Sequence, residues 1–116
     1  IFLLPTASPE SSEMISAREL AEKMKQPDPP FVLDVRGEVE TQVSIIPGAV
    51  LIPLEQLEQR LNELDKNREI VIFCRTGKRS KRALLKLKRY GYKNLKDLTG
   101  GINAWVEMVD TSMMQY

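Results

Sequence analysis

The fold is decided by the stretch Ile70-Val71-Ile72-Phe73-Cys74-Arg75-Thr76-Gly77-Lys78-Arg79-Ser80-Lys81-Arg82-Ala83. Four apolar residues lead directly into the only cysteine, and a short cationic loop with one glycine separates that cysteine from a helical pattern. A short apolar run followed by a turn and a helix is typical of a buried parallel strand that feeds a crossover helix. Because open α/β sheets bind their ligands at the carboxyl ends of strands, we expect the functional site at Cys74.

The surroundings of Cys74 favour a reactive thiol. Loop N–H groups and the start of the next helix form an anion site beside the sulfur. Arg75, Lys78 and Arg79 add positive charge, so we expect the thiol to ionise more readily than a free cysteine. The sequence therefore predicts an activated cysteine that handles an anionic sulfur species. The alternative is that this lone cysteine is a small buried apolar residue.

Composition restricts the chemistry. The chain has 116 residues, enough for one domain with a single core, and no apolar run approaches the ~20 residues of a membrane span. One cysteine excludes an internal disulfide, and the absence of histidine argues against a transition-metal site and removes any Cys–His mechanism. We expect neither a metal nor a cofactor nor a membrane partner.

Basic residues are concentrated around the cysteine. Ten of the 17 lysines and arginines lie between Arg75 and Lys96, where there is no acidic residue. Such a run forms either a solvated helix face or a positive field that attracts an anion or an acidic protein surface. Only Tyr90 and Tyr92 are aromatic within it, which disfavours nucleic acid as a partner.

The remaining chain predicts strands alternating with helices. Residues 1–13 are expected to be a linker or tail, and residues 14–116 the folded domain. Strands are expected at 14–15, 31–36, 49–52, 70–73 and 95–98, and helices at 16–26, 37–43, 53–64, 80–90 and 102–109. The predicted core-facing residues of the last three helices are Leu54, Leu57, Leu61 and Leu64; Ala83, Leu84, Leu87 and Tyr90; and Ile102, Trp105, Val106 and Val109. This alternation predicts an α/β fold in three layers, with a mostly parallel five-stranded sheet between helices.

Two further local features are predicted. Ser16 and Glu19 have the spacing of a capping box at the start of the first helix. Asp34 and Arg36 end a strand at the rim of the sheet, where we expect them to pair and to support loops rather than to catalyse. Arg36 with Glu40 is a second expected pair at this rim.

Four motifs occur in order along residues 14–109. They are Leu33-Asp34-Val35-Arg36; Ile46-Pro47-Gly48-Ala49 with Ile52-Pro53; Cys74 to Ser80; and Leu98-Thr99-Gly100-Gly101-Ile102 with Trp105. Together they resemble the rhodanese domain. The tail, with Trp105, Val109, Asp110 and Gln115-Tyr116, is similar to rhodanese domains fused behind an adenylating domain in adenylyltransferase–sulfurtransferases of the molybdopterin-synthase sulfurylase type.

The resemblance implies a cytoplasmic sulfurtransferase. Cys74 would take a sulfane sulfur from thiosulfate or a persulfidated desulfurase and carry it as a persulfide. Arg75, Thr76, Gly77, Lys78 and Arg79 would bind the substrate, largely through loop N–H groups, with Gly77 at positive φ. The acceptor would be the C-terminus of a small ubiquitin-like sulfur-carrier protein that serves molybdopterin synthesis or tRNA thiolation. A fused N-terminal adenylating domain is implied as well.

Three alternatives remain open at this point. The chain could be a free-standing thiosulfate sulfurtransferase, or a non-catalytic rhodanese-fold module that binds a protein or RNA partner through its basic face. The third alternative is a phosphatase or arsenate reductase on the same fold. The six-residue loop Cys74–Arg79 argues against this third alternative, because the related phosphatases use a loop one residue longer.

Overall fold

The apolar runs of the sequence form one sheet in the computed structural model, which describes residues 11–116. Its strands are β1 (Met14–Ile15), β2 (Phe31–Asp34), β3 (Val50–Leu51), β4 (Ile70–Phe73) and β5 (Leu95–Leu98). They lie in the order β1-β5-β4-β2-β3, and every neighbouring pair is parallel. The predicted five-stranded parallel sheet is therefore confirmed, with the strand that leads into Cys74 at its centre.

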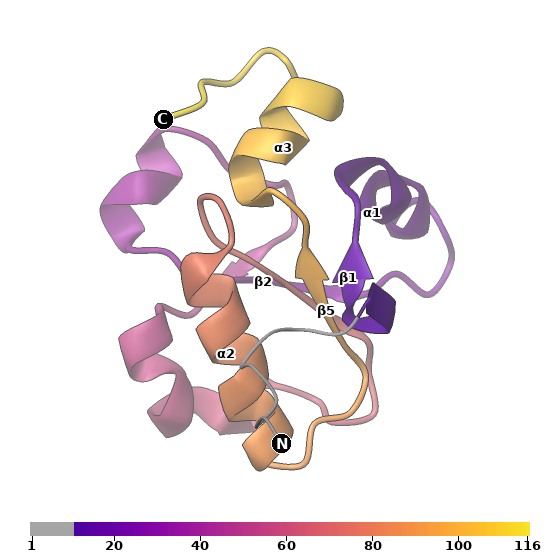
Figure 1. The fold of residues 1–116 in the computed structure, drawn as a ribbon, viewed down its shortest axis with the longest axis vertical. Helices are drawn as coiled ribbons and strands as arrows, with labels where there is room; N and C mark the ends of the chain where they lie inside the picture. The colour runs from indigo at the N-terminus through magenta and orange to yellow at the C-terminus, as the bar shows by residue number, and fades with distance from the viewer. Residues whose placement is uncertain (1–10) are drawn as a thin grey trace, which may run out of the picture.

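Helical segments cover both faces of the sheet (Figure 1). The α-helices are α1 (Ala17–Met24), α2 (Lys78–Arg89) and α3 (Gly101–Met108), and the 3₁₀ segments are η1 (Ser11–Glu13), η2 (Glu38–Gln42) and η3 (Leu54–Glu63). Residues 1–10 of the expected linker lie outside the described residues. None of the helices within residues 11–116 is long and apolar enough to cross a membrane.

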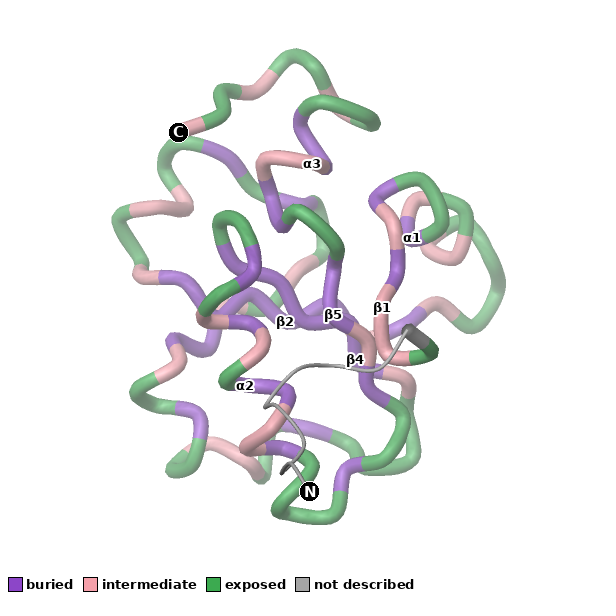
Figure 2. Tube along the Cα trace, viewed as in Figure 1, coloured by how far each residue is buried: buried purple, intermediate pink, exposed green. Residues whose placement is uncertain are grey.

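The alternation of β4 divides the core into two clusters. Ile70 and Ile72 pack with α2 and η3 on one face, whereas Val71 and Phe73 pack with α1 and α3 on the other. Cys74 continues the first series and belongs to the cluster beneath α2. Figure 2 shows the central strands buried and the connecting loops largely exposed. The strand that positions the cysteine is therefore anchored from both sides.

The capping box at α1 is present as expected. The Ser16 Oγ accepts the Glu19 N–H at 3.1 Å, and the Ser16 N–H donates to Glu19 Oε1 at 3.0 Å. These reciprocal bonds satisfy two donors that a helix start otherwise leaves without partners.

The helix expected over residues 53–64 differs in kind. It is the 3₁₀ segment η3, and Arg60 interrupts it with non-helical angles (φ −121°, ψ 21°). A 3₁₀ helix has three residues per turn, which matches the three-residue step from Leu54 to Leu57. Leu57 and Leu64 are buried and Leu54 is partly buried against the same cluster, so the predicted core face survives the change.

Two expected core positions are wrong, because both lie where a helix ends. Tyr90 follows α2 and is 43% exposed, and its hydroxyl donates to Glu58 Oε2 at 2.9 Å. Val109 follows α3 and is 37% exposed. Beyond Gly91, which has φ +88°, Tyr92 enters the core instead, and its hydroxyl donates to the Leu61 carbonyl at 3.1 Å.

The amino end of α3 holds the chain that leaves β4. The Ile102 N–H donates to the Cys74 carbonyl at 2.9 Å, and the Asn103 N–H donates to the Arg75 carbonyl at 3.3 Å. Gly101 has φ +62°, and a Cβ at this position would overlap the carbonyl oxygens of Cys74 and Arg75. Only glycine combines this backbone angle with so close an approach.

Replacing Gly101 by alanine should therefore be costly. Gly48→Ala is the matched control, because Gly48 also has positive φ (+86°) but nothing lies within 4 Å of its would-be Cβ. We expect Gly48→Ala to lower the free energy of unfolding by about 1–2 kcal/mol through backbone strain. Gly101→Ala should cost on the order of 3 kcal/mol or more, because the clash adds to the strain. Equal losses in denaturant titrations would contradict the packing described here.

Candidate active site

Cys74 lies directly after β4, at the carboxyl edge of the sheet, with 1% of its surface exposed. Its Sγ accepts the N–H of Gly77 at 3.1 Å and the N–H of Ser80 at 3.4 Å. The Ser80 hydroxyl lies 3.5 Å from the same sulfur and donates to the Gly77 carbonyl at 3.1 Å. The cysteine is thus buried beside the apolar core, yet its sulfur faces a cradle of N–H groups.

Gly77 makes the cradle possible. It is the residue immediately before α2, and its φ of +134° confirms the positive φ predicted at this position. This turn aims the Gly77 N–H back at the sulfur and starts a 12-residue helix beside it. The first N–H groups of a helix have no partners within the helix, and they carry partial positive charge. The arrangement is therefore suited to an anion on the sulfur.

The three cationic side chains of the loop have different surroundings. Arg75 and Lys78 are exposed, as is Thr76. Arg79 is bound instead by Glu40, with Nη1 to Oε1 at 2.5 Å and Nη2 to Oε2 at 2.8 Å. The structure therefore leaves Arg75 and Lys78 at the loop surface, whereas Arg79 ties the loop to η2.

Arg36 is completely buried and organises the rim of the sheet. The expected pair with Asp34 is present: Nε donates to Oδ1 at 2.9 Å, and Nη2 donates to Oδ2 at 2.8 Å. Nη2 also donates to the Ser44 carbonyl at 2.8 Å, and the guanidinium lies 5.3 Å from the centre of the Phe73 ring. Because a buried charge is tolerated when it is paired and fully hydrogen-bonded, this cluster fixes the loop after β2.

The expected pair of Arg36 with Glu40 needs correction. Arg36 Nη1 donates to the Glu40 backbone carbonyl at 3.3 Å, whereas the Glu40 carboxylate accepts from Arg79 and from the Tyr116 hydroxyl. The hydrogen bond from Arg79, helped by the hydrogen bond from the Tyr116 hydroxyl, lowers the pKa of Glu40 to about 2 against the opposing effect of burial. The sequence could not show whether Arg36 binds the backbone carbonyl or the side-chain carboxylate of Glu40, because both oxygen acceptors belong to the same residue.

Ser80, Tyr116 and Asp97 take part in the site or lie beside it. The sequence analysis quoted Ser80 and Tyr116 only within motifs and gave none of the three a role in the site. Asp97 is 1% exposed, and its Oδ1 has no hydrogen-bond donor among residues 11–116. Burial raises the pKa of Asp97, and the neighbouring Ser80 hydroxyl and Lys81 ammonium offset part of this rise. The alternation of side chains along a strand could have indicated that Asp97 is buried. Asp97 is two residues from the buried Leu95 and therefore lies on the same face of β5.

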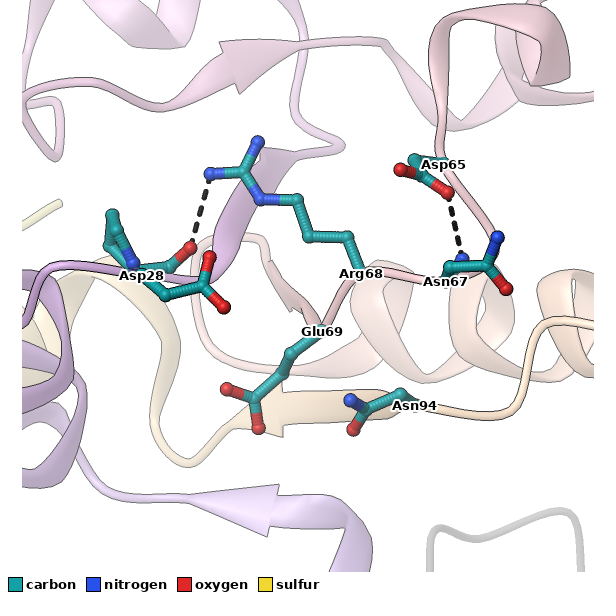
Figure 3. Close-up of a pocket in the computed structure, with 7 residues that line it drawn as sticks. Asp28, Asp65, Asn67, Arg68, Glu69 and Asn94 are labelled. Atoms are coloured by element: carbon teal, nitrogen blue, oxygen red, sulfur yellow. Dashed lines mark hydrogen bonds between the residues drawn. The ribbon is translucent and has the colours of Figure 1, made fainter.

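A polar hollow lies at the opposite edge of the sheet (Figure 3). It is lined by Asp28, Pro29, Asp65, Asn67, Arg68, Glu69 and Asn94, which precede β2, β4 and β5. Arg68 Nη2 donates to the Pro29 carbonyl at 3.1 Å, and the Asn67 N–H donates to Asp65 Oδ1 at 2.8 Å. Since Cys74 follows the other end of β4, this hollow is separate from the cysteine loop.

Glu40 should make the free energy of unfolding decrease as the pH falls into the acidic range. Its folded pKa is lower than its unfolded pKa of about 4.3, so its contribution is present above that value and is lost as the pH falls toward 2. We expect Glu40→Gln to lower the free energy of unfolding by on the order of 1–2 kcal/mol at pH 7, with the difference shrinking below about pH 4. Glu58→Gln, at an exposed pair with Lys86, is the control and should cost less. A pH-independent deficit in Glu40→Gln would be evidence against this pairing.

Asp97 should have the opposite effect on the pH dependence of the free energy of unfolding. Its folded pKa is raised, so folding favours the protonated form and stability falls as the pH rises above the unfolded value of about 3.9. Asp97→Asn removes this charge and should raise the free energy of unfolding at pH 7 by on the order of 1 kcal/mol. The exposed Asp28→Asn should change little. Chemical denaturation at pH 4 and pH 7 checks the sign, and a loss of stability in Asp97→Asn at pH 7 would refute it.

Comparison with known proteins identifies the family. The family model described as "Rhodanese-like domain" matches residues 16–108. A protein named "Sulfurtransferase" from Allochromatium vinosum is 33% identical over 91 residues, which cover 78% of this chain and 85% of that protein. The Arabidopsis thaliana protein "Adenylyltransferase and sulfurtransferase MOCS3" is 31% identical, and the match covers 98% of this chain but 27% of that protein.

A solved structure agrees with these matches. The human single-domain sulfurtransferase TSTD1 superposes with a TM-score of 0.73 at 26% identity, over 83% of this chain and 96% of that one. The fold, the family model and the sequence relatives all agree. The chain belongs to the rhodanese-like domain family and is a sulfurtransferase.

Proposed function

We propose that Cys74 carries sulfane sulfur as a persulfide and passes it to an acceptor. The observation that carries this proposal is the pair of N–H groups, from Gly77 and Ser80, that donate to the Cys74 sulfur at the end of β4. Backbone N–H groups that are already aimed at a site of negative charge stabilise that charge without rearranging. They therefore suit a thiolate that must act without a histidine base.

With thiosulfate as donor, the transfer has two steps. The Cys74 thiolate attacks the outer sulfur, a new S–S bond forms at Sγ, and the S–S bond of thiosulfate breaks with its electron pair leaving on sulfite. The terminal sulfur of the resulting persulfide then carries the negative charge. A nucleophilic acceptor such as cyanide attacks this sulfur in the second step, the S–S bond breaks, and its electron pair restores the Cys74 thiolate. Arg75 and Lys78, exposed on the loop, supply positive charge near both anions.

We further propose that the acceptor is the C-terminus of a small ubiquitin-like sulfur-carrier protein, in a cytoplasmic pathway of molybdopterin synthesis or tRNA thiolation. Support comes from the Arabidopsis relative, whose name joins an adenylyltransferase to a sulfurtransferase and of which this chain spans about a quarter. In this proposal an adenylating domain precedes the chain and adenylates the C-terminal carboxylate of the carrier. The terminal sulfur of the Cys74 persulfide attacks the acyl carbon, and AMP leaves. A thiol reductant then cleaves the S–S bond, which releases the carrier thiocarboxylate and leaves the reductant in disulfide linkage with Cys74 until a second thiol frees it. A persulfidated desulfurase would then be an alternative donor to thiosulfate.

Free-standing thiosulfate sulfurtransferase activity is the second candidate. The Allochromatium vinosum sulfurtransferase favours it, because this chain covers 85% of that protein, which leaves little room there for a fused domain. The two candidates share the persulfide and differ in the acceptor. Transfer from the persulfidated chain to an adenylated carrier would support the first, and transfer to cyanide alone would support the second.

The ion pair between Arg79 and Glu40 argues against the phosphatase alternative. The Arg79 guanidinium gives two N–H groups to the Glu40 carboxylate and is not free to bind an anion. A phosphate in the loop would need additional donors besides the N–H groups. This pairing weighs against phosphate-ester hydrolysis, because Arg79 would have to leave Glu40 before it could bind a phosphate in the loop.

The proposal predicts a single covalent adduct. Incubation with thiosulfate should add one sulfur atom per chain, mapped to Cys74 by mass spectrometry, and cyanide should remove it as thiocyanate. Because the chain has one cysteine, the assignment is unambiguous. Cys74→Ser, which keeps the size of the buried side chain nearly unchanged, should fold but take up no sulfur. An intact mass without adduct from either thiosulfate or a persulfide donor would overturn the proposal.

A further inference from the structure

The side chain of Tyr116 reaches back to the cysteine loop. Its hydroxyl donates to Glu40 Oε2 at 2.6 Å and accepts from Arg36 Nη1 at 2.9 Å. Its ring lies under the Arg75 guanidinium, with 5.2 Å between the guanidinium carbon and the ring centre. Figure 1 shows the last residues beside the η2 segment and near the loop that leads into α2.

The backbone of Tyr116 is held as well. Its N–H donates to Asn103 Oδ1 at 3.2 Å, and its carbonyl accepts from Asn103 Nδ2 at 3.2 Å. Asn103 belongs to α3, and its own N–H holds the Arg75 carbonyl. Two hydrogen bonds to one side-chain amide fix both the position and the direction of the segment at Tyr116.

Through Tyr116, Arg75 is connected to Arg36 and Glu40, which are themselves joined by the hydrogen bond from Arg36 Nη1 to the Glu40 carbonyl. Arg36 follows β2, Glu40 lies in η2 and binds Arg79, and Arg75 directly follows the cysteine. Burial and the hydrogen bond to Glu40 both raise the pKa of Tyr116, so its hydroxyl stays protonated and continues to donate. The exposed Arg75, which an aromatic face holds in one place, retains N–H groups for another partner, because a cation–π contact does not use them.

We propose that Tyr116 is a positioning residue for sulfur transfer, which holds the Arg75 guanidinium at the loop to receive a doubly charged anionic donor such as thiosulfate. This inference rests on the proposed persulfide chemistry of Cys74. The ring fixes Arg75, and the hydroxyl secures Glu40, which in turn keeps Arg79 engaged. Arg75, rather than Arg79, is then the arginine that recognises the donor.

The test compares two sulfane donors of different charge, the thiosulfate dianion and the methanethiosulfonate monoanion. Tyr116→Leu removes the ring and the hydroxyl, and we expect the KM for thiosulfate to rise about threefold, as loss of a cation–π contact predicts. The KM for methanethiosulfonate should rise less, and kcat should change little with either donor. Tyr116→Phe keeps the ring and should stay close to wild type in the KM for thiosulfate.

Arg75→Gln completes a double-mutant cycle. If Tyr116 acts through Arg75, Tyr116→Leu in the Arg75→Gln background should give no further rise in the KM for thiosulfate. Tyr90→Leu is the matched control, because the Tyr90 hydroxyl also donates to a glutamate bound by a cation but lies at the far end of α2. It should leave both KM values unchanged.

Three outcomes decide the inference. An unchanged KM for thiosulfate in a folded Tyr116→Leu, or equal rises for both donors, would overturn it. If Tyr116→Leu does not fold, Arg75→Gln alone decides, since it must raise the KM for thiosulfate more than that for methanethiosulfonate. Persulfidation of wild-type Cys74 is scored separately. Its failure would remove the proposed function itself, whereas normal persulfidation with unaltered KM values would remove only the role of Tyr116.

Discussion

The hydrogen bonds from the Gly77 and Ser80 N–H groups to the Cys74 sulfur are the constraint on which the site depends. They require a glycine at positive φ before α2, and they require that the chain leaving β4 stay in place. The amino end of α3 meets the second requirement by donating to the Cys74 and Arg75 carbonyls. The amino ends of two helices thus hold the same short loop. The start of α2 binds the Cys74 sulfur, and the start of α3 binds the loop backbone.

Charged side chains around this loop form ion pairs that neutralise only part of its positive charge. The buried Arg36 is paired with Asp34, and Arg79 is paired with Glu40, so both arginines serve the architecture. The exposed cations Arg75 and Lys78 remain near the loop surface. Basic residues farther along α2 also form surface pairs, such as Lys86 with Glu58. The positive run in the sequence is therefore partly structural and partly available for an anion.

The sequence predicted the sheet, the position of the cysteine and the role of Gly77 in the turn, because these depend on local apolar patterns and on one backbone angle. It predicted the Asp34–Arg36 pair, which is local, but it could not predict that the Glu40 carboxylate binds Arg79, since these two residues are 39 residues apart in the chain. Tyr116 follows a segment without periodicity, and only the fold brings it to Arg36. Asp97 was within reach of the strand alternation, because it lies two residues from the apolar Leu95 in the predicted strand.

The proposed stabilisation of charge on the Cys74 sulfur by the loop is tested most directly in amide NMR spectra recorded before and after reaction with thiosulfate. A persulfide held in this cradle predicts that the Gly77 and Ser80 amide resonances shift more than those of other loop residues, and that cyanide restores them. If Cys74 gained a sulfur atom while these two resonances stayed unchanged, the N–H groups would not be contacting the charge, and the physical basis of the site would be contradicted.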